Sequence, residues 1–368
     1  MKILTVLGTR PDWCANAMLI KMLDKWLGED FILCHSGQHY DYLLNEIFFE
    51  QLDIREPDHF FEIGSGSDAY QIGELLKKSE DILKEEKPDL VLSFGDANPS
   101  QFAISATKLG IRVAHLEAGM RSGDFRMPEE KNRLIIDAIS NYFFTPVRAS
   151  WQNLMNEGKD ASKCCIVNKQ IIDTVEEHKK EIEASKVLEK YNLYPKEYFL
   201  TEIHRKENTE SKENLTNIMR GLQAIWKEFG LTIIAAFHPR TMNALQRYGF
   251  TNPEGISFIG LQGMFEFEAL VKNALCCISD SGTIQETACY YGTPVVTTRP
   301  STERVEAIEC GASMLVGEKD GSFIPTSILR ATQEMLNRKW ECPYTIGANA
   351  KILRELERIE HEKPSIWW

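Results

Sequence analysis

The sequence predicts an α/β protein made of two Rossmann-like domains that face each other across a cleft. Three observations support this fold class. The chain has 368 residues, more than one ordinary domain core accommodates. Short apolar runs alternate with longer amphipathic stretches, which is the pattern of a parallel sheet wrapped by helices. The alternation occurs in two consecutive series, so we expect two sheets rather than one.

Apolar runs mark the expected strands of each series. In the first series they are residues 3–7, 31–34, 90–94, 113–116 and 142–144. Helical periodicity fills the gaps, for example at residues 69–84 and 134–140. The second series begins near Cys164, and its runs are residues 164–167, 198–203, 231–237, 256–259, 275–278, 294–298 and 312–316.

A charged helical stretch at residues 168–196 is typical of a crossing between two domains. We therefore expect an N-terminal domain at residues 1–166 and a C-terminal domain at residues 167–350. The last periodic segment, residues 349–361, predicts a helix with an apolar face. We expect residues 351–368 to form a C-terminal helix that packs back on the N-terminal domain.

The composition excludes several classes of protein. A formal net charge of −12 disfavours a nucleic-acid partner, because binding to a phosphate backbone needs a basic surface. No apolar run approaches the roughly 18 residues that span a bilayer, and the short N-terminal run is unlike a signal peptide, so we expect no membrane partner. The nine cysteines include no CxxC pair, which indicates free thiols in a reducing, cytoplasmic setting. No strong metal-binding spacing occurs, and we expect no metal.

Polar residues follow seven of the apolar runs. These loops are residues 8–11, 37–39, 95–96, 117–119, 204–205, 238–240 and 279–282. Functional loops in parallel sheets lie beyond the carboxyl ends of the strands. Loops of this kind in both series predict a site that the two domains share.

The segment Ser281-Gly282-Thr283 ends an apolar run and opens a helix. The N–H groups at such a helix start can hold a diphosphate, although an ordinary N-cap explains the residues equally well. Glu286 could reach a ribose diol or could simply favour the helix dipole. Arg10 could supply a cation to a phosphate or could be a solvated surface arginine. No GxGxxG spacing is present, so we expect no nicotinamide cofactor.

Three acids carry the catalytic hypothesis. Asp96 and Glu117 end consecutive strands, and Glu129 follows Pro128 at an expected helix start. Carboxylates that converge on one site can divide acid and base roles between them. Each also has a structural interpretation, as a helix cap, an ion-pair partner or a first-turn acid.

Two histidines end strands of the second series. His204 is followed by Arg205, and His238 precedes Pro239 and Arg240. An imidazole at a strand end could donate to a phosphate or shuttle a proton. A single histidine is more often a structural group, so both interpretations stay open.

Together the motifs resemble the non-hydrolysing UDP-N-acetylglucosamine 2-epimerases and relatives that act on modified UDP-sugars. The resemblance covers nearly the whole chain. Its motifs are GTRP at 8–11, GQH at 37–39, GD at 95–96, HLEAGMRSGD at 115–124, PEEKNR at 128–133, HRKEN at 204–208, SDSGTIQE at 279–286 and TER at 302–304. Residues 45–49 look more like the relatives that process dideoxy or diacetamido UDP-sugars.

The resemblance implies a GT-B-like fold, a homodimer, a UDP-sugar substrate and no cofactor. It implies an epimerase that inverts C2 of a UDP-N-acetylhexosamine for surface polysaccharide precursors, by elimination and re-addition of UDP. The N-terminal domain would hold the catalytic acids and the C-terminal domain would bind UDP. The implied catalytic residues are Asp96, Glu117, Glu129 and His204. The implied substrate-binding residues are Arg10, Gln38, His39, Arg133, Arg205, His238, Ser281, Gly282, Thr283, Glu286 and Arg304.

The chain departs from the family pattern near the phosphates. Ala15 stands at a position where the family has lysine, and Lys169 stands where it usually has asparagine. Lys169 and Lys21 are candidates to replace the missing charge. Three functions therefore stay open. The chain could be a 2-epimerase, or an enzyme of the same fold that hydrolyses UDP-sugars or transfers the sugar. It could also be a UDP-sugar-binding protein without catalysis.

Overall fold

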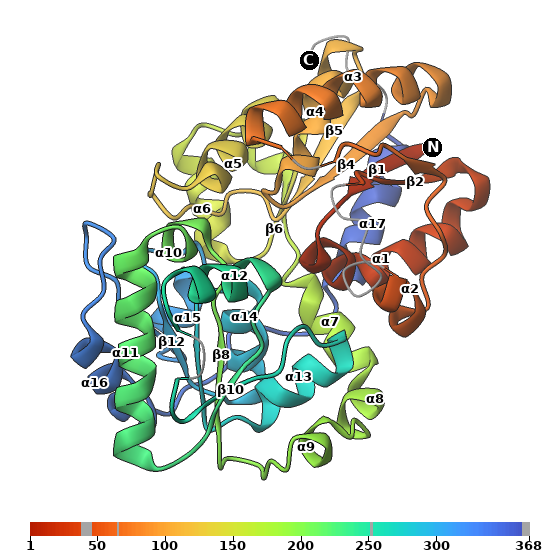
Figure 1. The fold of residues 1–368 in the computed structure, drawn as a ribbon. Helices are drawn as coiled ribbons and strands as arrows, with labels where there is room; N and C mark the ends of the chain where they lie inside the picture. Colours follow the sequence, from red (N-terminus) through yellow and green to blue (C-terminus); the bar gives the residue numbers. More distant parts are fainter. Residues whose placement is uncertain (38–45, 65, 251–252, 363–368) are drawn as a thin grey trace. The chain divides into compact units, whose positions relative to one another are not determined.

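A computed structural model describes residues 1–37, 46–64, 66–250 and 253–362 of the chain. The chain divides into two compact units, and each is described by itself. The first unit comprises Met1–Thr174 and Thr345–Trp368, and the second comprises Val175–Tyr344. Figure 1 follows the chain through both units by colour.

A seven-stranded parallel sheet forms the centre of the first unit. Its strand order is β3-β2-β1-β4-β5-β6-β7. The order reverses between β1 and β4, which are hydrogen-bonded neighbours. At such a switch point the loops that leave the two strands diverge and open a crevice for ligands. The strands are β1 Ile3–Leu7, β2 Phe31–His35, β3 His59–Phe60, β4 Leu90–Phe94, β5 Arg112–Leu116, β6 Tyr142–Thr145 and β7 Cys164–Ile166.

The second unit repeats this plan with six parallel strands. Their order is β10-β9-β8-β11-β12-β13, and the switch point lies between β8 and β11. The loops after these two strands begin at Ile203 and Asp280. The strands are β8 Phe199–Glu202, β9 Ile233–Ala235, β10 Ile256–Phe258, β11 Cys276–Ser279, β12 Val295–Thr297 and β13 Ser313–Leu315.

Helices connect the strands, as parallel pairing requires. In the first unit they are α1 Arg10–Leu27, α2 Glu46–Leu52, α3 Asp68–Glu86, α4 Ala103–Lys108, α5 Pro128–Ile139, α6 Arg148–Asn156 and α17 Ala348–Glu360, with short 3₁₀ turns at Gly28–Asp30, Asn98–Phe102 and Ala161–Lys163. In the second unit they are α8 Lys179–Glu183, α9 Val187–Lys190, α10 Lys206–Thr209, α11 Lys212–Phe229, α12 Pro239–Arg247, α13 Met264–Asn273, α14 Gly282–Tyr291, α15 Val305–Glu309 and α16 Pro325–Met335. Helix α7, Gln170–Glu177, carries the chain from one unit into the other.

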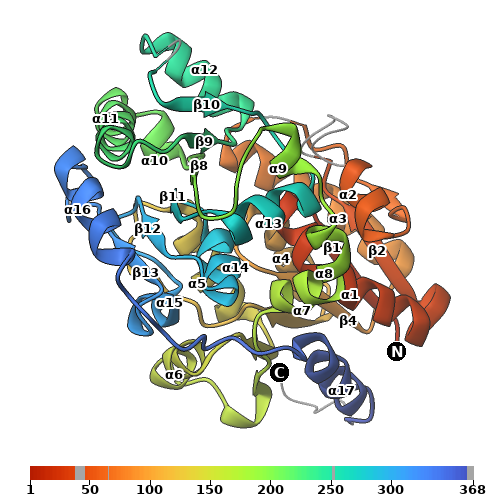
Figure 2. The same cartoon turned by 90° about the horizontal axis from the view of Figure 1, so that it is seen from below.

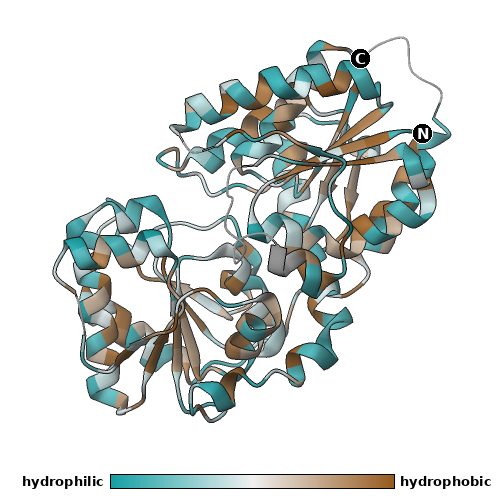
Figure 3. Cartoon of the chain, turned by 45° about the vertical axis from the view of Figure 1, so that its right-hand side comes forward, coloured by the Kyte–Doolittle hydropathy of each residue, from teal (hydrophilic) through white to brown (hydrophobic). Residues whose placement is uncertain are grey.

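Each unit has its own apolar core. In the first unit Leu4, Val91 and Val113 of the central strands pack with Phe102 and Ile136 of the connecting segments. The second core gathers around the long amphipathic helix α11 and the strands beside it. In Figure 3, brown predominates on the strands at the centre of each unit, whereas the helices around them alternate between teal and brown. Burial of these faces is the main source of stability for both units.

The C-terminal helix α17 packs against α1 within the first unit (Figure 2). Asp173 accepts hydrogen bonds from the backbone N–H groups of Gly347 at 2.6 Å and Asn349 at 2.8 Å, which satisfies the helix start. At the other end, Glu360 accepts from the amino group of Met1 at 2.8 Å. The chain therefore returns to the first unit after it has built the second.

The prediction of two Rossmann-like parallel-sheet domains is confirmed. One expectation was wrong, because the strand at Cys164 does not begin the second series. Cys164–Ile166 pairs with β6 as the edge of the first sheet. The two-residue edge strand β3 was not predicted, since two residues carry no readable alternation. In the part of the chain that the structure describes, no helix combines the length and the apolar character that crossing a membrane demands.

Candidate active site

Two carboxylates follow neighbouring strands of the first sheet. Asp96 comes after Gly95 at the end of β4, and Glu117 directly follows β5. The two strands are in parallel register, so both acids lie at the same edge. Glu117 has φ of 67°, a left-handed conformation that costs a non-glycine residue roughly 1–3 kcal/mol. A Cβ added to Gly95 would lie 3.7 Å from Glu117 Oε2, which shows that the loop after β4 runs beside this carboxylate.

A buried arginine holds Asp96. Arg133 donates from Nε to Asp96 Oδ2 at 2.8 Å, and its Nη2 lies 2.5 Å from the same oxygen. Its third nitrogen, Nη1, donates to Glu130 at 2.6 Å. Glu130 in turn accepts from the backbone of Ser122 and Gly123, both at 2.9 Å. The arginine side chain is 2% exposed and the Asp96 side chain 23%, so a buried cation supports an accessible acid.

Glu117 has a similar support. Lys169 donates from Nζ to Glu117 Oε1 at 3.3 Å and to the sulfur of Met120 at 3.4 Å. The lysine side chain is 1% exposed and the glutamate side chain 18%. The other candidate for a replacement charge, Lys21, lies 3.6 Å from Asp53. Of the two lysines, Lys169 is the one that reaches an acid of the candidate site.

Buried charged and polar groups hold the loops on either side of Glu117. His115 Nδ1 faces Asp137 Oδ1 at 2.7 Å, and His115 Nε2 faces the carbonyl oxygen of Gly95 at 2.9 Å. Asp137 also accepts from the backbone of Gly119 at 3.0 Å and pairs with Arg121 at 2.7 Å. Burial alone would raise the pKa of Asp137, but His115 and Arg121 outweigh it and hold that pKa below its ordinary value. This ionised carboxylate fixes the loops on both sides of Glu117.

The first turn of α1 adds a carboxyl that the sequence did not single out. Asp12 accepts from the backbone of Thr9 at 2.9 Å and of Gly8 at 3.3 Å, and together with Thr9 it closes a capping box. Burial raises the pKa of Asp12 to about 7, and the charge of Asp96 adds to the rise. Arg10 begins the same helix and is half-buried. The only sequence signal for Asp12 was its place three residues after the N-cap.

Glu129 lies in the first turn of α5, after Pro128, and is half-buried. Its neighbours on that helix, Glu130 and Arg133, are the residues that anchor Asp96. The first unit thus brings Asp96 and Glu117 to one edge and carries Glu129 on the helix that supports this edge. Glu130 and Asp137 are supporting residues that sequence reasoning missed.

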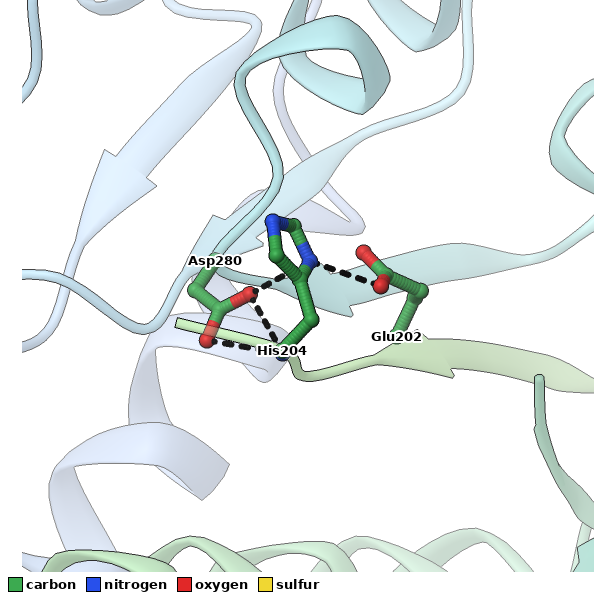
Figure 4. Close-up of side chains that lie close together, drawn as sticks. All are labelled: Glu202, His204 and Asp280. Carbon is green, nitrogen blue, oxygen red and sulfur yellow. Dashed lines mark hydrogen bonds and ion pairs between the residues drawn. The ribbon is translucent and has the colours of Figure 1, made fainter. Parts of the chain in front are cut away.

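In the second unit, an imidazole lies between two carboxylates. His204 follows β8, and its Nδ1 is 2.7 Å from Glu202 and 3.3 Å from Asp280. Figure 4 shows the ring between the two acids, with its other nitrogen pointing away from both. Burial alone would lower the pKa of His204, but Glu202 and Asp280 raise it to about 9. The ring is therefore an imidazolium at neutral pH, and its side chain is 40% exposed.

The same three residues are close enough together to suggest a metal site. Their existing bonds favour another role. Asp280 accepts from the backbone of His204 and Arg205, both at 3.1 Å, and from the amide of Asn208 at 2.8 Å. Both oxygens of Asp280 already accept hydrogen bonds from this loop, and Nδ1 of His204 is turned to Glu202 rather than to an open position. The cluster fits the support of an imidazolium better than it fits a metal.

The start of α14 carries the predicted anion-binding residues. Ser281 is the N-cap, and its side chain makes no capping hydrogen bond. A Cβ added to Gly282 would lie 2.4 Å from Arg304 Cζ, so the guanidinium of Arg304 lies across this first turn. Arg304 donates to Glu286 at 2.9 Å and also contacts Glu303. A helix start and an arginine together make a local positive site suited to phosphate.

Glu303 is shared among three arginines. It pairs with Arg299 at 2.6 Å and lies 3.8 Å from Arg205, in addition to its contact with Arg304. The Glu303 side chain is fully buried, whereas that of Arg205 is 13% exposed. The buried Glu303 thus supports Arg205, a more accessible cation, as Asp280 supports His204.

The remaining expected residues divide into two groups. His238 is the N-cap of α12, and its Nδ1 accepts from the backbone of Arg240 at 3.1 Å. Thr283 lies in the first turn of α14 and is half-buried. Gln38 and His39 lie outside the described residues.

Comparisons with known proteins agree with the predicted resemblance. A model of the family described as UDP-N-acetylglucosamine 2-epimerase matches residues 23–357. The UDP-N-acetylglucosamine 2-epimerase of Methanococcus maripaludis is 38% identical over 363 residues, which are 96% of this chain and 97% of that protein. The UDP-2,3-diacetamido-2,3-dideoxy-D-glucuronate 2-epimerase of Pseudomonas aeruginosa is 36% identical over 86% of this chain and 88% of its own length. The crystal structure of Methanocaldococcus jannaschii UDP-GlcNAc 2-epimerase in complex with UDP-GlcNAc and UDP superposes with a TM-score of 0.91 at 37% identity, covering 97% of this chain and 100% of that one.

Proposed function

Since this chain belongs to the UDP-N-acetylglucosamine 2-epimerase family, we propose that it inverts C2 of a UDP-N-acetylhexosamine. One observation carries the proposal beyond the family name. In the first unit, the more accessible carboxylates Asp96 and Glu117 pair with buried cations. In the second unit, the more accessible cations His204 and Arg205 pair with the buried carboxylates Asp280 and Glu303. The first arrangement suits proton transfer, and the second suits a diphosphate leaving group.

The proposed reaction is an elimination followed by an addition. The C1–O bond breaks with its electron pair leaving on UDP, while a carboxylate takes the proton from C2. This gives a 2-acetamidoglucal with a double bond between C1 and C2. A proton then returns to the opposite face of C2, and UDP adds back to C1. No hydride moves in these steps.

We assign the proton-transfer roles to Asp96, Glu117 and Glu129 as a group. Arg133 and Lys169 would keep the first two in place without contacting the substrate. His204 would donate from Nε2 to the diphosphate, because its Nδ1 is turned to Glu202. A charge-assisted hydrogen bond of this kind gains strength as negative charge develops on UDP.

Further residues complete the proposed diphosphate and nucleotide contacts. Arg304 and the first turn of α14 would add N–H donors to the phosphates. The other proposed binding residues are Arg10, Gln38, His39, Arg205, His238 and Glu286. Among these, Glu286 already accepts from Arg304, so a ribose contact would have to share its carboxylate.

The sugar could be plain or modified. One relative is named for UDP-N-acetylglucosamine and another for UDP-2,3-diacetamido-2,3-dideoxy-D-glucuronate, at similar identity. We therefore propose a UDP-HexNAc as the class and test both members. The family resemblance further supports a homodimer and a cytoplasmic role in making precursors of surface polysaccharides. Sedimentation equilibrium tests the dimer.

The test is an incubation in heavy water without NAD, with UDP-N-acetylglucosamine and UDP-2,3-diacetamido-2,3-dideoxy-D-glucuronate as separate substrates. We expect the epimerised product to carry deuterium at C2, detected by NMR. An epimerised product that keeps its original hydrogen would contradict direct proton abstraction. Steady accumulation of free UDP would instead favour a hydrolysing or sugar-transferring enzyme, and binding without either change would favour a non-catalytic protein.

A further inference from the structure

Three cysteines of the second unit lie close together. Cys289 belongs to α14, Cys310 directly follows α15, and Cys342 lies in the segment after α16. The sulfur of Cys289 is 3.9 Å from that of Cys310 and 3.9 Å from that of Cys342. All three are free thiols. Cys289 is therefore the centre of the cluster and contacts both of the others.

The three cysteines differ in their exposure to solvent. Cys289 is buried, whereas Cys310 and Cys342 are each partly exposed. A reagent from solvent can thus reach an outer sulfur first, and the inner sulfur is in place to react second. Cysteine sites that form reversible disulfides have this pairing of an attacking and a resolving thiol.

The hydrogen bond between Cys289 and Cys342 shifts the pKa values of the two thiols in opposite directions. It raises the pKa of Cys289, as burial also does, and it lowers the pKa of Cys342 to about 7. A thiolate is the reactive form of cysteine. By contrast, burial raises the pKa of the partly exposed Cys164 in the first unit to about 11.

We propose that Cys289 and Cys342 form a reversible disulfide with a small disulfide such as oxidised glutathione as the oxidant, and that Cys310 is the alternative partner of Cys289. The Cys342 thiolate attacks one sulfur of the small disulfide, whose S–S bond breaks and releases one thiol. Cys289 then loses its proton and attacks Cys342, releasing the second thiol. Two protein thiols are oxidised and one small disulfide is reduced to two thiols.

The fold gives this bond a definite consequence. It joins α14, which begins at the proposed anion-binding turn, to the segment that leads out of the second unit at Tyr344. Trp340 of that segment already donates to the carbonyl oxygen of Cys289 at 3.2 Å. The two cysteines are 53 residues apart, and a crosslink over such a span restricts the unfolded chain strongly. We expect the melting temperature of the second unit to rise by roughly 5–10 °C.

The test treats the full chain with oxidised glutathione and counts thiols in denaturant. The wild-type protein should lose two of its nine thiols and yield a Cys289–Cys342 crosslinked peptide that dithiothreitol removes. Cys342→Ser should yield Cys289–Cys310 instead. Cys289→Ala should yield neither crosslink and should retain glutathione on Cys342. Cys164→Ser is the matched control and should behave as the wild type.

Two results would overturn the proposal. One is a wild-type protein that keeps all its thiols or gains only mixed disulfides. The other is a crosslink pattern that Cys289→Ala leaves unchanged. Melting curves of the reduced variants show whether each has folded, and Cys342→Ser at a partly exposed position gives an independent answer if Cys289→Ala does not fold.

Discussion

The two units place charge in opposite ways. In the first, Arg133 and Lys169 are buried, and the acids they hold are the more accessible partners. In the second, Asp280 and Glu303 are buried, and the histidine and arginine they hold are the more accessible partners. A buried partner fixes the orientation of the accessible one and keeps it ionised. The comparison teaches that the same α/β plan can present either sign of charge, depending on which partner of each pair the core encloses.

Removal of the accessible acids should have the largest effect on activity. Asp96→Asn and Glu117→Gln keep the shape of each side chain but take away its basicity. Turnover should fall by about 100-fold or more in each variant, because a positioned acid or base contributes at least that much. Calorimetry should find UDP affinity largely unchanged, since neither acid is among the proposed UDP contacts. The exposed acid variant Glu85→Gln is the control, and full activity in both site variants would remove these acids from the mechanism.

The next test removes a buried cation and leaves its acid. Lys169→Met keeps the length and the apolar stem but deletes the donor to Glu117. A hydrogen bond between charged groups is worth about 1.5–3 kcal/mol, so kcat should fall roughly 10- to 100-fold. KM should change little, because Lys169 would act through Glu117 rather than on the substrate.

Two further variants separate positioning from stability in the Lys169 test. Lys169→Arg keeps the charge and should recover part of kcat, which a merely structural role would not predict. Lys21→Met removes the other candidate lysine, whose partner is Asp53, and should have wild-type kinetics. A loss in Lys21→Met equal to that in Lys169→Met would contradict the assignment of Lys169.

Much of this comparison lies beyond what the sequence reveals. The strands were predictable because buried strands of a parallel sheet read as continuous apolar runs, and the loops after them followed from the fold rule. The positions of Asp96, Glu117 and His204 were therefore available from sequence. Several of the supports were not, because they join residues that are far apart in the sequence. Lys169 and Glu117 are 52 positions apart, and His204 and Asp280 are 76 apart. No local pattern tells whether a lysine will be enclosed or solvated.

Substitution of Gly282 tests whether the first turn of α14 in the second unit binds the diphosphate. Gly282→Ala adds a Cβ where the guanidinium carbon of Arg304 would lie 2.4 Å away, so the arginine must move. We expect UDP to bind about tenfold more weakly, the loss of one charge-assisted contact. Gly73→Ala, within α3 and with open space around its Cβ, is the control and should bind UDP as the wild type does. Unchanged affinity in Gly282→Ala would mean that this turn does not hold the diphosphate.

The smallest expected effect concerns the acid beside the histidine. Glu202 and Asp280 raise the pKa of His204 to about 9, above its ordinary value of 6.5. A raised histidine pKa means that the imidazolium is present in the folded protein below about pH 9. Its contribution to stability is complete below the unfolded value near 6.5 and is lost as the pH rises through about 9. If the imidazolium binds the diphosphate, UDP affinity should also fall as the pH rises through about 9.

Glu202→Gln keeps the hydrogen-bond acceptor and removes one negative charge, so the pH at which UDP affinity falls should move toward neutral. At pH 7 the affinity should fall only a few-fold, while at pH 8.5 the gap from the wild type should widen, because there the wild-type ring is still mostly protonated. Calorimetric titrations of UDP from pH 6 to 10, with an NMR titration of the ring, measure both quantities. If the pKa of the ring falls in the variant but UDP affinity is still lost only near pH 9, the proton on His204 does not govern UDP binding.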